Sequence, residues 1–86
     1  MRGVKEAVKG KTVSKKRTGK RIRQLILEKG LNAVQVQKQL ELESPQSVYK
    51  WMYGYSLPSV QNLYRLSRLL DVEIKEILVC EEDDKP

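Results

Sequence analysis

Polar side chains that can hydrogen-bond to DNA bases cluster in one short stretch, residues 44–54 (SPQSVYKWMYG). A Gln can bind adenine through two hydrogen bonds, a Lys can bind guanine, and a Ser can bond to either base pair, all from within a major groove. The residues of this kind, with a tyrosine at their rim, are Gln46, Ser47, Tyr49 and Lys50. An ordinary amphipathic surface helix would suit this stretch equally well, so its surroundings must decide.

The same stretch carries the signals of a helix over residues 45–53. Ser44 can accept from the first unpaired N–H groups, and Pro45 suits a first turn where no N–H is needed. Gly54 suits the left-handed position that ends a helix. Val48 and Trp51 are three residues apart and share one face, so we expect an apolar underside and an outward polar face.

Two predicted helices precede this one. The first covers residues 18–29, where Ile22 and Ile26 lie on the apolar stripe and Gly30 follows as a stop. The second begins at Asn32, which can form a capping box with Gln35. It must end before Ser44, because a residue that precedes proline avoids helical geometry. The second and third helices then form a helix-turn-helix.

Apolar residues at helical spacing predict two more helices. The fourth runs from Ser59 to Asp71 and the fifth covers residues 74–79. The apolar positions of the fourth helix are Val60, Leu63, Leu66, Leu69 and Leu70. We therefore expect a compact all-α domain of five helices.

Positive charge is concentrated at the N-terminus. Residues 1–23 hold ten Lys and Arg against one Glu, a net of +9, and the other 63 residues hold seven against ten acidic residues, a net of −3. We expect a disordered basic arm over 1–17, the helix-turn-helix domain over 18–79 and an acidic tail over 80–86. The arm would either follow DNA phosphates and a minor groove or serve only as a solubilising leader.

Composition argues against several other classes. One cysteine and no histidine exclude an internal disulfide and a Cys/His metal site. The chain has no apolar run of membrane-spanning length, no signal peptide and no cluster of catalytic residues. We expect a cytoplasmic protein that is not an enzyme, needs no metal or cofactor and does not bind membranes.

From about Gly19 to Leu78 the chain resembles the Cro/repressor-type, lambda-repressor-like family, also called the Xre family. The resemblance rests on Arg21, Ile22, Leu25, Gly30, Leu31, Asn32, Leu40, Leu42, Ser44, Pro45, Gln46, Ser47, Val48, Lys50, Trp51, Gly54, Leu57, Pro58, Ser59, Leu63, Leu66, Ser67, Leu69, Leu70, Val72, Ile77 and Leu78. It implies a lambda-repressor-like fold and sequence-specific binding of double-stranded DNA. The implied function is a transcriptional regulator, chiefly a repressor, of bacterial, phage or mobile-element type.

The chain departs from the family pattern around the helix-turn-helix. Ala33 replaces the usual glutamine, Gln37 replaces a small residue, and Glu41 replaces the glycine of the turn. The turn is also one residue longer, with Glu43 as the apparent insertion. We expect the longer turn to remove the need for a left-handed glycine and to leave room for Gln37.

By resemblance, Gln46, Ser47 and Lys50 face base edges, with Tyr49 at the rim. The amides that begin the second helix, at Asn32 and Ala33, match a phosphate anchor. Further contacts to the DNA phosphate backbone are expected from Arg17, Lys20, Arg21, Tyr53, Tyr55 and Ser56. The alternative for the cations is solvated surface charge, and for the two tyrosines it is packing against neighbouring helices.

Domains of this family usually bind an inverted repeat as homodimers. The predicted dimer surface is the fifth helix, through Ile74, Ile77, Leu78 and Val79, although Ile74 and Ile77 could instead close the core. An alternative function is an antitoxin or antirepressor that binds a protein partner through the same fold. A tail long enough to wrap a toxin would favour it, and only eight residues follow Leu78.

Overall fold

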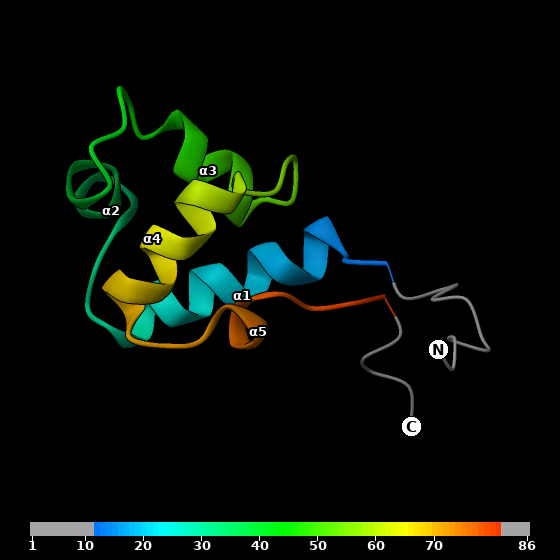
Figure 1. Cartoon of the computed structure of the whole chain (residues 1–86). Helices are drawn as coiled ribbons and strands as arrows, with labels where there is room; N and C mark the ends of the chain where they lie inside the picture. Colours follow the sequence, from blue (N-terminus) through cyan, green and yellow to red (C-terminus); the bar gives the residue numbers. More distant parts are fainter. Residues whose placement is uncertain (1–11, 82–86) are drawn as a thin grey trace.

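A computed structural model describes residues 12–81 of the chain. Its five helices are α1 (Lys15–Glu28), α2 (Ala33–Gln39), α3 (Gln46–Met52), α4 (Val60–Leu70) and α5 (Ile74–Ile77). In Figure 1, α1 runs through the middle of the domain, with α3 on one side and α5 on the other. The predicted all-α fold of five helices is confirmed.

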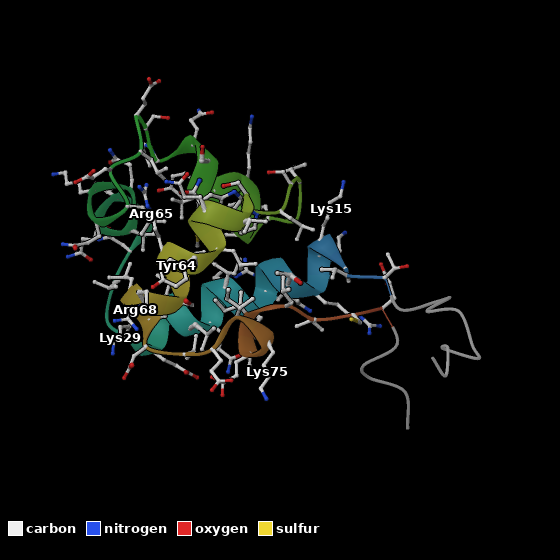
Figure 2. All side chains as sticks on the ribbon, in the orientation of Figure 1. Lys15, Lys29, Tyr64, Arg65, Arg68 and Lys75 are labelled. Atoms are coloured by element: carbon white, nitrogen blue, oxygen red, sulfur yellow. The ribbon has the colours of Figure 1, made fainter. Side chains whose placement is uncertain are left out.

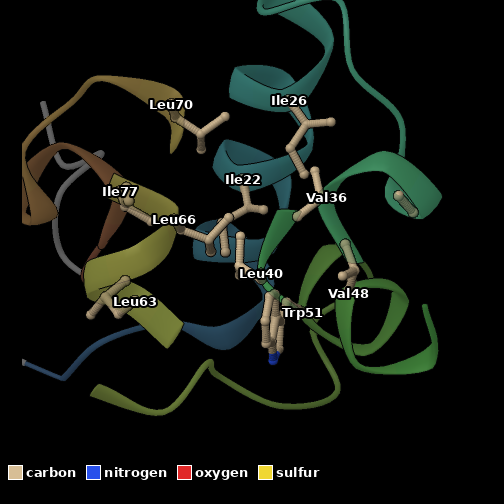
Figure 3. Close-up of a cluster of buried hydrophobic side chains, with 11 residues drawn as sticks. Ile22, Ile26, Val36, Leu40, Val48, Trp51, Leu63, Leu66, Leu70 and Ile77 are labelled. Carbon is tan, nitrogen blue, oxygen red and sulfur yellow. The ribbon is translucent and has the colours of Figure 1, made fainter. Parts of the chain in front are cut away.

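Every helix contributes to one hydrophobic core (Figure 3). Periodic apolar residues meet there because each helix turns its apolar stripe inward, which removes that surface from water. The buried members are Ile22, Ile26, Ala33, Val36, Leu40, Val48, Trp51, Leu63, Leu66, Leu70 and Ile77. The core therefore fixes how α2 and α3 sit on α1, and with them the helix-turn-helix.

The first four helices end in the same way, with one residue in the left-handed conformation. These residues are Gly30, Glu41, Gly54 and Asp71, with φ of 75°, 58°, 79° and 59°. After each of them, the next residue donates its backbone N–H to a carbonyl five residues earlier, as in a Schellman motif. The two glycines adopt this geometry without strain, whereas the two acidic residues are strained by it.

Glu41 corrects one expectation about the longer turn. The turn still needs a left-handed residue, because the Leu42 N–H bonds to the Gln37 carbonyl at 3.0 Å and the Glu41 N–H bonds to the Lys38 carbonyl at 3.1 Å. The Gln37 side chain also donates to the Leu42 carbonyl, at 2.7 Å. The Gln37 side chain therefore stabilises the turn directly.

Helix α1 begins three residues earlier than predicted, and the two ends of the described chain explain why. Ser14 caps the helix by accepting from the Arg17 N–H at 3.0 Å. Residues 12–14 pair antiparallel with residues 79–81, through Ser14 N–H to Val79 O at 2.7 Å and Glu81 N–H to Thr12 O at 2.8 Å. We call this pairing the terminal clasp.

The clasp corrects both predicted domain boundaries. Residues 15–17, assigned to the arm, are helical, and Cys80 and Glu81, assigned to the acidic tail, are paired. The remainder of the predicted arm and tail, residues 1–11 and 82–86, lies outside the described residues.

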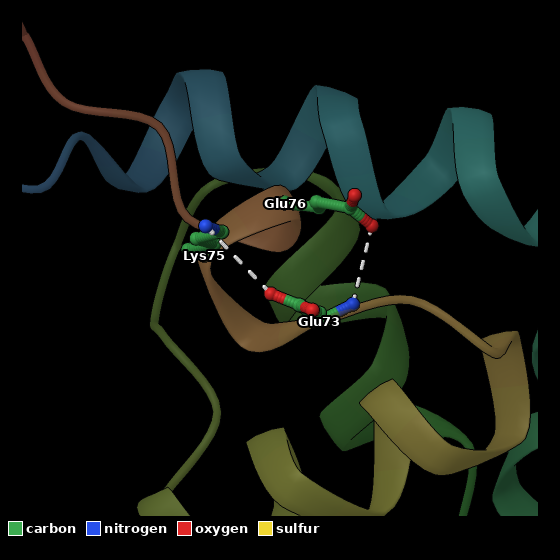
Figure 4. Close-up of polar contacts among 3 residues, drawn as sticks. All are labelled: Glu73, Lys75 and Glu76. Carbon is green, nitrogen blue, oxygen red and sulfur yellow. Dashed lines mark hydrogen bonds and ion pairs between the residues drawn. The ribbon is translucent and has the colours of Figure 1, made fainter.

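Helix α5 is shorter than the predicted 74–79. It opens with a reciprocal cap in which the Glu73 N–H donates to Glu76 Oε1 at 3.1 Å, beside an exposed Lys75–Glu73 ion pair of 3.8 Å (Figure 4). The chain then becomes extended at Leu78, because the terminal clasp holds Val79. Ile77 is 0% exposed and belongs to the core, so its predicted place on a dimer surface is wrong. Within residues 12–81, no helix is long and apolar enough to cross a membrane.

Candidate nucleic-acid interface

Helix α3 has the two faces that its sequence predicts. Val48 is fully buried and Trp51 is 4% exposed, both within the core in Figure 3. On the other face Gln46, Tyr49 and Lys50 are exposed, while Ser47 is half-buried. No acidic residue occurs in the sequence of α3, so this outer face offers amide, hydroxyl and ammonium groups without a competing carboxylate.

The start of α3 is capped from the preceding turn. Ser44 Oγ accepts from the Gln46 N–H at 3.3 Å, and Pro45 has a helical φ of −76°. The Pro45 carbonyl accepts from the Tyr49 N–H at 3.1 Å. The helix proper begins at Gln46, one residue later than predicted, with Pro45 at the cap position.

Two glycines bring the end of α3 against α1. A Cβ atom on Gly19 would lie 2.9 Å from the Met52 carbonyl oxygen and closer still to that of Trp51. A Cβ atom on Gly54 would lie 2.9 Å from Lys16 Cα. The backbones approach too closely there for any side chain. Helix α1 therefore sets the position of the polar face of α3.

Backbone N–H groups at the start of α2 find their hydrogen-bond acceptors within the chain. The Asn32 N–H donates to Gln35 Oε1 and the Gln35 N–H donates to Asn32 Oδ1, both at 2.9 Å, which confirms the predicted capping box. Asn32 is exposed and the Ala33 methyl is buried. A phosphate contact at Asn32 and Ala33 stays a prediction, and the Asn32 side chain already orders this helix start.

The cations of α1 divide between two sides of the helix. Arg17 donates to the Glu81 carbonyl at 2.7 Å and Arg21 donates to the Glu76 carbonyl at 2.8 Å, so both guanidinium groups are engaged with the C-terminal part of the chain. Their predicted phosphate contacts would compete with these bonds.

On the side that meets α3, a hollow of about 310 Å³ is lined by Lys16, Lys20, Arg23, Met52 and Tyr53. The structure thus brings the predicted residues Lys20 and Tyr53 together and adds Lys16. Lys16 precedes Lys20 by four residues, a spacing that places both on one helical face. This signal was missed because the predicted helix began only at Thr18.

Tyrosines continue the exposed surface beyond α3. The rings of Tyr49 and Tyr53 stack with centroids 6.4 Å apart and planes 12° apart. Tyr55 is 75% exposed, which argues against the alternative that it packs on neighbouring helices. Its backbone N–H and that of the half-buried Ser56 bond to the Lys50 carbonyl at 2.9 and 3.4 Å, so the loop is anchored to α3.

Other cations lie at a distance from this surface. Figure 2 shows Lys29, Arg68 and Lys75 toward the lower part of the view, away from α3. Arg65 on α4 donates to the Leu40 carbonyl at 3.3 Å and so holds the end of α2. The polar face of α3 and the adjacent hollow on α1 together form the candidate interface.

A family model for the helix-turn-helix matches residues 22–77, which is more than half of the chain. This chain belongs to the lambda-repressor-like, or Xre, family of helix-turn-helix proteins. The family consists of DNA-binding transcriptional regulators. The identification agrees with the resemblance carried by the sequence motifs.

Solved structures agree on the fold. The restriction-modification controller protein C.AhdI from Aeromonas hydrophila is 27% identical, with a TM-score of 0.67 over 73% of this chain and 94% of that one. The DNA-binding domain of BldD from S. venezulae is 22% identical, with a TM-score of 0.66 over 77% and 97% of the two chains. The clp gene regulator ClgR from C. glutamicum is 16% identical, with a TM-score of 0.65 over 73% and 80%. The comparison with curated proteins gives no significant match.

Proposed function

We propose that this protein is a sequence-specific transcriptional repressor of bacterial, phage or mobile-element type, which reads the major groove with the outer face of α3. The observation that carries the proposal is the exposed set Gln46, Tyr49 and Lys50 above a buried Val48 and Trp51. Side chains that are exposed on this face remain available for base edges. Amide and ammonium groups are the ones that distinguish adenine and guanine there.

Phosphate contacts would hold α3 in register on the duplex. Lys16 and Lys20 line the hollow at the end of α3, and Tyr55 and Ser56 follow in the loop. Such contacts give affinity without sequence preference, whereas contacts to bases give the preference. Substitutions of the phosphate-binding residues should therefore weaken binding to all duplexes, whereas substitutions of the base-reading residues should change the sequence preference.

The protein would act as a homodimer on an inverted repeat, because one helix-turn-helix reads few base pairs. Ile74, Leu78 and Val79 are only half-buried and remain candidates for the dimer surface. Repression then requires only that the bound dimer occupy a promoter, in the cytoplasm and without enzymatic activity.

The test is selection from a randomised duplex library with the purified protein at about 0.15 M salt, where exposed charges are partly screened. We expect enrichment of an inverted repeat whose half-sites lie about one helical turn apart. Binding without enrichment would overturn sequence specificity, and no binding would overturn the proposal as a whole.

A further inference from the structure

One side chain of α1 is stacked on the recognition surface instead of pointing into solvent. Arg23 Cζ lies 5.6 Å from the centre of the Tyr53 ring, and Tyr53 stacks on Tyr49 at 6.4 Å between centroids. We call these three residues the aromatic column. It connects the middle of α1 to the outer face of α3 through side chains alone.

Both contacts in the column have favourable geometry. A guanidinium within about 6 Å of a ring centre is attracted by the negative face of the ring. Aromatic pairs attract each other at centroid separations of about 4.5–7 Å. Tyr53 and Tyr49 are nevertheless 53% and 42% exposed, so burial alone does not hold these rings in place. The stacking contact with Tyr53 is therefore expected to restrict the rotamers of Tyr49.

Tyr49 stands beside the proposed base-reading residues. Gln46 precedes it by three positions, which makes the two residues neighbours on one helix face. Lys50 follows Tyr49 directly and is exposed like both of them. Its ring is apolar, and the apolar group of a major groove is the C5 methyl of thymine. An aromatic ring held at this point can bury that methyl group.

We propose that Tyr49 recognises a thymine methyl in the DNA site and that Arg23, acting through Tyr53, is a positioning residue for it. This inference rests on the proposed function. It adds a readout by contact with a methyl group to the hydrogen-bond readout expected from Gln46 and Lys50. It also assigns to Arg23 a role in specificity that needs no contact with a base.

The test replaces each thymine of the selected site, one at a time, by deoxyuridine, which lacks only the C5 methyl. Binding is measured by fluorescence anisotropy. For the wild type, we expect one position in each half-site to weaken binding about fourfold, the factor for loss of one buried methyl group. The effect should persist in Tyr49→Phe and vanish in Tyr49→Ala.

Arg23→Gln should reduce this methyl effect to less than twofold, whereas Arg23→Lys, which keeps a cation near Tyr53, should retain most of it. Lys20→Gln is the matched control on the same helix: it should weaken the thymine and deoxyuridine duplexes equally. Each variant is compared with itself on two duplexes. The effect of any lost phosphate contact therefore cancels in the ratio of the two affinities. Far-UV circular dichroism establishes that every variant is folded.

The outcomes separate the two proposals. A selected site with no thymine sensitive to the substitution would overturn recognition by Tyr49 while leaving the proposed function intact. A methyl effect unchanged in Arg23→Gln would overturn the positioning role of Arg23. Failure to select any site would remove the proposed function and this inference with it.

Discussion

Replacing Gly19 by alanine tests whether α1 sets the position of the recognition helix. In a helix interior, the change should stabilise the protein by about 1 kcal/mol through helix propensity. Here the new Cβ atom would lie 2.9 Å from the Met52 carbonyl oxygen and closer to that of Trp51, and both are backbone atoms that cannot rotate away. Overpacking of this kind costs about 1–3 kcal/mol. With the upper value, the two terms leave a net destabilisation of about 2 kcal/mol.

Urea unfolding followed by far-UV circular dichroism measures the change. With a slope near 1 kcal/mol per molar urea for so small a domain, the midpoint should fall by about 2 M. The neighbouring exposed residue provides the control, since Lys20→Ala should stay within about 0.5 kcal/mol of the wild type. An unchanged or higher midpoint for Gly19→Ala would show that α1 and α3 do not touch at this glycine.

Three further predictions concern packing and backbone geometry, each measured by the same unfolding experiment. Trp51→Ala should destabilise the fold by about 3–5 kcal/mol because its ring is 4% exposed, and a loss below 1 kcal/mol would mean that α3 is not seated as described. Thr18→Val should cost about 1–3 kcal/mol, since the Val79 N–H loses its 2.9 Å bond to the buried Thr18 hydroxyl. Glu41→Gly should raise stability by about 1 kcal/mol by relieving a φ of 58°, whereas a decrease would show that the glutamate is not strained there.

Local signals predicted most of the fold. The capping box of Asn32 and Gln35 and the left-handed Gly54 each depend on residues within one helical turn, and each is found in the structure. The apolar face of α3 was likewise evident from the spacing of Val48 and Trp51. Interactions of this range can be read along the chain because their partners are neighbours in sequence.

Long-range pairings could not be predicted in that way. Ser14 became the start of α1 because its N–H bonds to the carbonyl of Val79, a partner 65 residues away. The same pairing at the clasp ends α5 early and brings the Glu81 carbonyl to Arg17, while Arg21 donates to the Glu76 carbonyl of α5. Nothing in the sequence around Arg17 and Arg21 distinguishes them from Lys20, which lies beside α3, so their different surroundings could not be predicted.

Glu41 illustrates a different failure, in which the expected length of the turn led to a wrong inference about its backbone geometry. The turn keeps a left-handed position at Glu41, which its expected extra length was to make unnecessary. Helix α2 must still end in a Schellman motif, since its last carbonyls need donors. The requirement comes from the helix end rather than from the length of the loop.

The central claim is that the outer face of α3 reads bases, and parallel selections with the wild type and Lys50→Ala test it most directly. Both proteins would be incubated with the same randomised duplex library and the bound pools sequenced. We expect the wild type to enrich an inverted repeat, and the variant to lose base preference at one position of each half-site while keeping it elsewhere, with a cost of about 1–3 kcal/mol. Identical motifs in the two pools would contradict a base contact by Lys50, and the absence of any motif would contradict base reading by α3 altogether.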